Sequence, residues 1–150
     1  MSQGLKVSFD RPEHHWLAIY LDAQNRHLEL PFSYTPFDFL SELVRALLNF
    51  LDGFAAKANC SYNPERYEFT FEPTADEGQF QVVSYPDHRK GEGLGEVIFN
   101  YRGDRADICL AFWRGIRELQ GRVSAAEYER GFGRVFPEQE MELLTERMKH

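Results

Sequence analysis

Residues 35–53 read TPFDFLSELVRALLNFLDG, and this stretch decides the fold. Apolar side chains recur along it every three or four residues, which is the spacing of a helix that buries one face. The expected buried positions are Leu40, Leu43, Val44, Leu47, Leu51 and Phe54. Thr35 suits the N-cap, Pro36 the first helical position and Gly53 the end of the helix. The stretch therefore predicts an amphipathic helix of about five turns.

Strand patterns lie on both sides of this helix. Three strands are predicted before it, at 5–9, 16–21 and 26–32, with a reversal at 22–25. Three more are predicted after it, at 67–72, 80–85 and 97–101. The connections between the last three are too short for crossover helices, so we expect an antiparallel meander. Within it, Val97, Phe99 and Tyr101 alternate with Glu96, Ile98 and Asn100 and are expected to share one face.

The C-terminal third reads as helices. One is predicted to begin near Asp104 and to end at Gly121. Ser124 and Glu127 form a capping-box pattern that opens a short helix, stopped by the glycines at 131 and 133, and a last helix follows Pro137. The element order predicts an α+β fold. We expect one domain over residues 1–150, with an antiparallel sheet of about five to six strands and the long helix and C-terminal helices packed on one face.

Composition narrows the classes of function. The 150 residues include 17 Lys and Arg against 24 Asp and Glu, which gives a formal net charge of −7. This balance disfavours binding to nucleic acid or to anionic membranes, because both require clustered cations. The chain has no apolar run long enough to span a bilayer and no secretory signal pattern at its start, so we expect a cytoplasmic protein. Cys60 and Cys109 are then expected to be reduced, buried thiols, with a single disulfide as the alternative.

Motifs for catalysis or metal binding are missing from the sequence. The five histidines show no metal-ligand spacing, and no serine lies in a nucleophile motif. The loop at 87–95, DHRKGEGLG, lacks the spacing and the following helix of a phosphate site, so it is interpreted as a hairpin loop or a contact loop for a partner. Arg114 and Arg117 beside Trp113 suit either phosphate binding or a solvated helix flank. We expect no catalytic residue, no cofactor and no metal.

Acidic residues gather around the strand at 67–72, where aromatic residues alternate with Glu68, Thr70 and Glu72. The pattern fits a solvated sheet face, an acidic protein-binding patch, or paired carboxylates for acid–base catalysis, which would also need an enclosing pocket. The candidate partner-binding residues are Glu65, Glu68, Glu72, Asp76, Glu77, Tyr85 and Asp87. Further aromatic anchors are Tyr34, Tyr62 and Trp113.

Three segments together resemble small bacterial α+β immunity proteins of toxin–immunity systems. They are the hairpin WLAIYLDAQNRHLEL at 16–30, the helix at 35–53 and the strand RYEFTFEP at 66–73. The resemblance implies an acidic, cytosolic, non-catalytic protein whose partner is a cognate toxin that it occludes. It transfers no binding residue onto this chain.

Two other hypotheses stay open. The 13 phenylalanines would suit a small-molecule-binding protein or enzyme with an aromatic-lined pocket between sheet and helix, near His27, Tyr20 or Cys109. The chain could also use its aromatic residues to form a homodimer.

Overall fold

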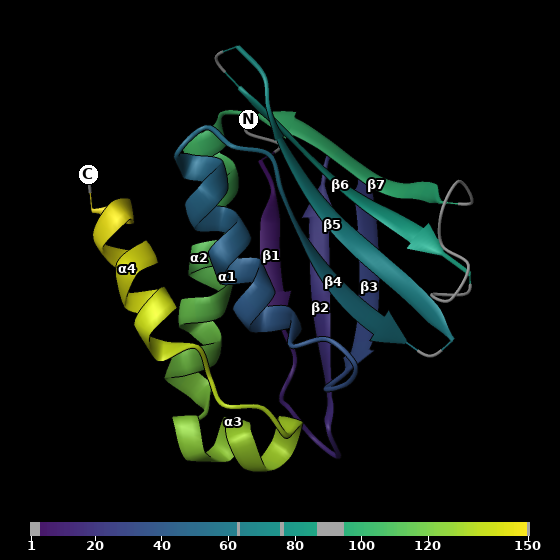
Figure 1. Cartoon of the computed structure of the whole chain (residues 1–150), viewed down its shortest axis with the longest axis vertical. Coiled ribbons are helices and arrows are strands. Elements are labelled where there is room, and N and C mark those ends of the chain that lie inside the picture. The colour runs from purple at the N-terminus through teal and green to yellow at the C-terminus, as the bar shows by residue number, and fades with distance from the viewer. Residues whose placement is uncertain (1–3, 63, 76, 87–94, 150) are drawn as a thin grey trace.

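The computed structural model describes residues 4–62, 64–75, 77–86 and 95–149, and it is an α+β structure with two antiparallel sheets and four helices (Figure 1). The strands are β1 Lys6–Phe9, β2 Trp16–Ala23, β3 Arg26–Ser33, β4 Ala56–Tyr62, β5 Glu65–Pro73, β6 Gly78–Tyr85 and β7 Glu96–Gly103. The helices are α1 Phe39–Leu51, α2 Arg105–Arg122, α3 Ala125–Phe132 and α4 Glu138–Met148. None of these described helices has the length and apolar character needed to cross a bilayer.

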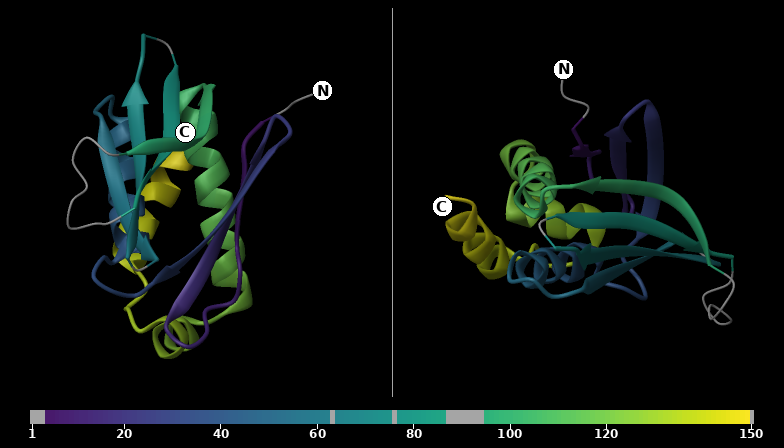
Figure 2. Two further views of the ribbon diagram at one scale, coloured as in Figure 1. Left: turned by 90° about the vertical axis from the view of Figure 1, so that its right-hand side faces the viewer. Right: turned by 90° about the horizontal axis from the view of Figure 1, so that it is seen from above.

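The strands divide into two sheets rather than the single sheet expected from the sequence. One has the order β1-β2-β3 and the other β4-β5-β6-β7, with every pairing antiparallel. The meander predicted after the long helix is thus confirmed, and β4 extends it by one strand. Figure 2 shows the two sheets diverging from each other, with α1, α2 and α4 gathered at one side of the molecule.

β4 escaped prediction because its sequence, AKANCSY, contains small and polar residues instead of large apolar ones. It is an edge strand, and α1 packs along it. Glu42 of α1 accepts hydrogen bonds from the backbone N–H of Asn59 at 2.8 Å and from its side-chain amide at 3.3 Å. The strand is therefore held by pairing with β5 on one edge and by a helix carboxylate on the other.

Phenylalanine rings fill the space between the two sheets and the helices. Phe39 of α1 lies 4.7 Å, between ring centroids, from Phe32 of β3 and 4.7 Å from Phe69 of β5. On the other side of the core, Phe80 of β6 lies 5.0 Å from Phe112 of α2. Edge-to-face pairs of this kind add to the stabilisation from burial alone. One cluster of buried residues thus joins both sheets to the helices.

The predicted start of the long helix is wrong. Thr35 and Pro36 lie in a turn before the helix, and α1 begins at Phe39 with Asp38 as its N-cap residue. The Asp38 side chain does not cap the backbone but accepts a hydrogen bond from the Ser41 hydroxyl at 3.0 Å. Because the Phe39 ring is fully buried between the two sheets, packing rather than the local capping motif sets the first helical residue.

One further helix boundary and the face of one strand residue differ from the prediction. Helix α2 continues through Gly121 to Arg122, because the next residue, Val123, is buried against the core and serves as the C-cap. A register shift between β6 and β7 leaves Ile98 without a partner on β6, so Val97 pairs with Val83 and is exposed instead of joining the buried face of Phe99.

Candidate protein-interaction surface

Glu68 lies at the centre of the predicted acidic face, and its charge is compensated. Its carboxylate is 3.2 Å from the Arg66 guanidinium and 3.6 Å from the Lys57 ammonium, and only 12% of the side chain is exposed. Arg66 also donates to the side-chain oxygen of Asn59 at 2.9 Å. The outer face of the β4–β7 sheet therefore presents a paired ionic network at this point, not a free acid.

The remaining predicted residues lie in several places. Glu65 is on the opposite face of β5 from Glu68 and Glu72, since alternate residues of a strand point to opposite sides. Glu72 is exposed at the far end of β5, about 24 Å from Glu65 along the strand. Glu77 is exposed in the turn after β5, and Asp76 and Asp87 lie outside the described residues. The predicted set is thus split between two faces and two ends of the sheet, and its binding role stays a prediction.

Side-chain amides occupy the middle of the same outer face. Asn100 of β7 accepts hydrogen bonds from Gln79 at 2.8 Å and from Gln81 at 3.1 Å, both on β6. These residues carry no charge and their donors are directed along the sheet. The centre of the face is consequently ordered, polar and close to neutral.

A pair of exposed aromatic residues joins the two sheets. Trp16 at the start of β2 and Tyr62 at the end of β4 meet edge to face, with ring centroids 5.5 Å apart and planes at 81°. Trp16 is 38% exposed and Tyr62 is 44% exposed. Exposing the apolar surface of such large side chains to water is unfavourable. Two large aromatic side chains held together at the surface are typical of a contact site for another protein.

One charged residue lies beside this pair, and the next residue along β5 points to the opposite face of the sheet. Glu65 is directly opposite Tyr62 in the β4–β5 pairing, and Arg66 follows it. The Arg66 guanidinium lies over the Tyr85 ring, 4.1 Å from its centroid. Arg66 and Tyr85 lie on the same face of the sheet as Glu68, opposite to Tyr62 and Glu65, so we refer only to Trp16, Tyr62 and Glu65 as the aromatic corner.

A hydrogen bond holds Glu65, the charged member of the aromatic corner, in place. The Tyr67 hydroxyl donates to the Glu65 carboxylate at 2.9 Å. Burial, followed by this carboxylate, raises the pKa of Tyr67 well above its ordinary value, so the phenol stays protonated and remains a donor. The Glu65 carboxylate is thereby held in place beside Tyr62.

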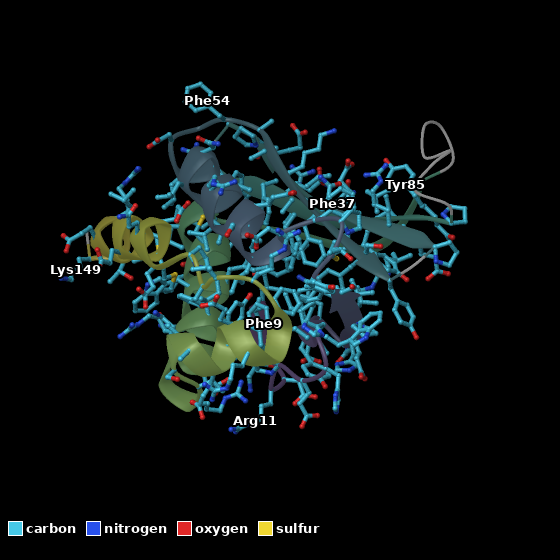
Figure 3. The ribbon with its side chains drawn as sticks, turned by 60° about the horizontal axis from the view of Figure 1, so that its bottom comes forward. Phe9, Arg11, Phe37, Phe54, Tyr85 and Lys149 are labelled. Atoms are coloured by element: carbon cyan, nitrogen blue, oxygen red, sulfur yellow. The ribbon has the colours of Figure 1, made fainter. Side chains whose placement is uncertain are left out.

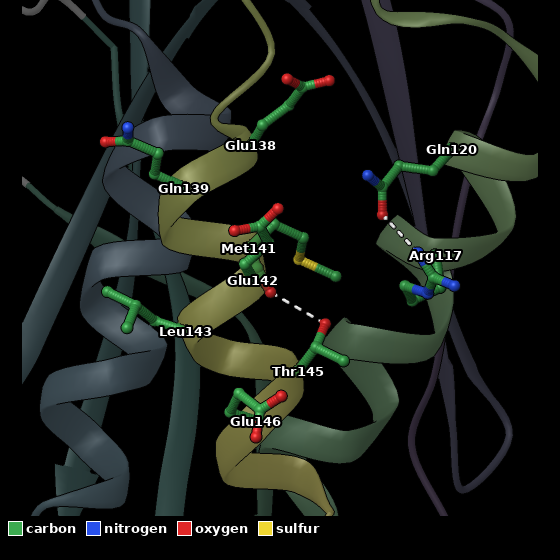
Figure 4. A pocket seen from close by; sticks show the side chains of 9 residues that line it. All are labelled: Arg117, Gln120, Glu138, Gln139, Met141, Glu142, Leu143, Thr145 and Glu146. Atoms are coloured by element: carbon green, nitrogen blue, oxygen red, sulfur yellow. Dashed lines mark hydrogen bonds between the residues drawn. The ribbon is translucent and has the colours of Figure 1, made fainter.

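A groove between α2 and α4 is the second surface feature, with a volume of about 680 Å³ (Figure 4). Glu138, Glu142 and Glu146 follow one another along α4 at four-residue spacing, and Arg117 faces them from α2. Arg117 donates to Gln120 at 3.2 Å, as Figure 4 shows. The groove is open and its side chains are mostly exposed, so it offers carboxylates without an enclosing pocket.

Nucleophilic and metal-binding groups do not converge in the described part of the chain. Cys60 and Cys109 are unpaired and buried, and burial raises the pKa of Cys109 to about 12. The Cys109 thiol lies 3.7 Å from the backbone oxygen of Leu47, inside the core. His27 pairs with Asp22 at 2.7 Å on the exposed side of the β1–β3 sheet. Among residues 4–62, 64–75, 77–86 and 95–149, no group of His, Cys, Asp or Glu could hold a metal ion.

The residues named for a pocket between sheet and helix lie apart. Tyr20 and His27 are on the outer face of the β1–β3 sheet, where Tyr20 donates to Asp10 at 3.1 Å. Cys109 is on the inner side, within the core. Trp113, one of the predicted anchors, donates its indole N–H to Thr145 of α4 at 2.9 Å and packs between two helices.

Trp16 is the functional candidate that sequence reasoning missed. The strand at 16–21 is predicted from the sequence, but Trp16 is not among the predicted surface anchors. Leu17, Ile19 and Leu21 are buried, so the alternation of the strand directs Trp16 outward. That signal was present in the sequence.

Comparisons with known proteins add no relative. No family model matches this chain, and the searches of curated proteins and of solved structures find no match.

Proposed function

We propose that this chain is a cytoplasmic protein-binding domain that acts as an immunity or inhibitor protein, occluding a basic surface of a cognate bacterial toxin through its aromatic corner. The observation that carries the proposal is the exposed Trp16–Tyr62 pair. Tryptophan and tyrosine are enriched among the residues that dominate binding energy at protein interfaces.

The charge of the chain supports a basic partner. A net charge of −7 draws a cationic surface toward the molecule and speeds association at low salt. Nuclease toxins bind an anionic substrate and so need a basic cleft, which an acidic protein can cover. The resemblance of the hairpin, the long helix and the strand at 66–73 to immunity proteins points to the same class of partner.

The packing of the core favours this function over a small-molecule pocket. The space between the sheets and α1 is occupied by rings in van der Waals contact, including Phe32, Phe39 and Phe69. The side chains that could give such a pocket chemistry, Tyr20, His27 and Cys109, lie on different sides of a sheet.

The test uses the purified chain as bait in an extract of its native host. Wild type is compared with Trp16→Ala and Tyr62→Ala, and Phe54→Ala is the matched control. Phe54 is 64% exposed and projects from the connection between α1 and β4, at the top of Figure 3. It precedes the start of β4, whereas Tyr62 is at the end of that strand. All three substitutions remove an exposed aromatic ring, so Phe54→Ala controls for the general effect of losing one at the surface.

We expect wild type and Phe54→Ala to retain one stoichiometric protein partner, and the two corner variants to bind it at least about tenfold more weakly, which corresponds to ~1.4 kcal/mol. The partner should carry a basic surface, and co-expression of the wild-type chain should suppress its toxicity. Failure to recover a stoichiometric partner, or equal binding by all four proteins, would overturn the proposal.

A further inference from the structure

Two buried polar atoms have no hydrogen-bond partner among the described residues: Oδ1 of Asp38 and the hydroxyl oxygen of Tyr128. Each exposes less than 1 Å² to solvent. Leaving such a group unpaired costs about 1–3 kcal/mol. More than about 90% of buried polar groups in native proteins have a partner, either in the protein or in an ordered water molecule. Two unpaired buried polar atoms in one small region are therefore unusual and require an explanation.

A chain of aromatic contacts joins the segments that carry Asp38 and Tyr128. Asp38 immediately precedes α1, whose first residue, Phe39, packs on Phe32 at 4.7 Å. Phe32 also contacts Phe132 of α3 at 5.6 Å, and Phe132 contacts Tyr128 at 5.5 Å. The start of α1 and the buried face of α3 thus meet around one ring.

Arg134 is a third polar residue that acts on this region. Its Nε donates to the backbone oxygen of Tyr34 at 2.7 Å, in the turn that leads to Asp38. Burial chiefly raises the pKa of Tyr128, the Asp38 charge raises it further and the Arg134 charge lowers it. Both charges therefore act on the phenol. The other carboxylate oxygen of Asp38 is already engaged by Ser41, which leaves Oδ1 as the acceptor to be satisfied.

We infer that one water molecule is bound at this point and bridges Asp38 Oδ1 to the Tyr128 hydroxyl, beside Arg134. A water molecule can donate to the carboxylate while accepting from the phenol or the guanidinium, and buried waters typically make about three such bonds. A metal ion is disfavoured because no group of three or more His, Cys, Asp or Glu residues that could hold one is found among the described residues, and an anion would be repelled by the Asp38 carboxylate. The bridge ties the start of α1 to α3, and it is independent of the aromatic corner.

The first test is the substitution Tyr128→Phe, read by thermal denaturation. With the bridge present, the variant removes the hydroxyl that helps to hold the water, so the ordered water is lost, Asp38 Oδ1 is left unpaired and we expect Tm to fall by about 2–4 °C. Without it, the substitution removes a buried unpaired hydroxyl, and Tm should stay constant or rise. Tyr67→Phe is the positive control because it loses a defined hydrogen bond to Glu65, and Tyr62→Phe is the control for an exposed hydroxyl.

A high-resolution crystal structure of the wild-type chain separates the bridge from a direct Asp38–Tyr128 hydrogen bond. We expect an ordered water within about 2.6–3.2 Å of both oxygens in wild type and not in Tyr128→Phe. The double variant Asp38→Asn with Tyr128→Phe should lose less Tm than the sum of the two single losses, because both act on one water. A direct contact between the two side chains, a dry site, or an unchanged or raised Tm in Tyr128→Phe would overturn the inference.

Discussion

Arg147 of α4 lies 2.7 Å from Asp52, which follows the end of α1, while Arg45 of α1 lies 3.4 Å from Glu140 of α4. On each segment the two charged residues are seven positions apart. The basic residue is on α1 in one pair and on α4 in the other. Seven residues are about two helical turns, so α1 and α4 run parallel with their charged residues in step. A shift of α4 along α1 would break both ion pairs, and the register of the C-terminal helix is thereby specified.

Reversing one charge should loosen α4. All four side chains are about a third to three-fifths exposed, so we expect Asp52→Arg to cost only about 0.2–1 kcal/mol in urea denaturation, with faster amide exchange confined to α4. The double reversal Asp52→Arg with Arg147→Asp should restore slow exchange. Lys149→Glu, which affects a pair within the end of α4, is the control. Equal exchange in all variants would show that apolar packing alone holds the helix.

Two glycines of α2 should respond oppositely to alanine. A Cβ at Gly115 would lie 2.6 Å from the backbone oxygen of Val7, because α2 packs directly on β1, whereas a Cβ at Gly121 would meet nothing within 4 Å. We expect Gly115→Ala to lower the free energy of unfolding by about 1–3 kcal/mol despite its better helix propensity. Gly121→Ala should raise it by up to about 1 kcal/mol. Chemical denaturation of both variants measures the difference, and equal shifts would contradict the close approach of α2 to β1.

The capping box of α3 should make stability depend on acid pH. Ser124 Oγ accepts from the Glu127 backbone N–H at 3.1 Å, and the Glu127 carboxylate accepts from the Ser124 backbone N–H at 2.8 Å. Hydrogen bonds from Ser124, first from its backbone, lower the pKa of Glu127. The contribution of the carboxylate is therefore present above its unfolded pKa of about 4.3 and is lost as the pH falls through the lower folded value.

Thermal denaturation from neutral to acid pH tests this dependence. The Tm difference between wild type and Glu127→Gln should shrink as the pH falls and Glu127 becomes protonated. Ser124→Ala should cost about 1 kcal/mol at neutral pH, because the backbone N–H of Glu127 loses its acceptor. A Tm difference that does not change with pH would contradict the role of the ionised carboxylate.

The two thiols should be inert in the folded protein and should weaken it at alkaline pH. Burial raises the pKa of Cys60 and of Cys109, the latter to about 12, above an unfolded value of about 8.5. Stability is then full below the unfolded pKa and declines as the pH rises toward the folded value. We expect no reaction with a thiol reagent at neutral pH and reaction of both cysteines in denaturant. The alkaline loss of Tm should be smaller in Cys109→Ala, and rapid labelling of the folded chain would contradict the burial.

Much of the local structure follows from short-range patterns. Tyr67, Phe69 and Phe71 face the core as their alternation predicts, and Ser124 and Glu127 form the predicted capping box. These features depend on residues within a few positions of one another, where strand alternation and cap chemistry are decisive.

The errors arise where a distant segment competes with the local pattern. Phe39 marks the start of α1 because it inserts between rings from β3 and β5, so the favourable Thr35–Pro36 cap is not used. The acidic face was expected from Glu68, but Lys57 approaches it from a neighbouring strand that the sequence did not reveal.

The sequence by itself determined an acidic α+β protein: the amphipathic α1, the antiparallel meander, the C-terminal helices and the aromatic character of the core. The tertiary structure alone decided that the strands form two sheets, that Glu68 is neutralised, and that Trp16 and Tyr62 meet at the surface. The reason is one of range: hydrophobic periodicity sets which face of an element is buried, whereas the partner of each face depends on contacts between segments far apart in the chain.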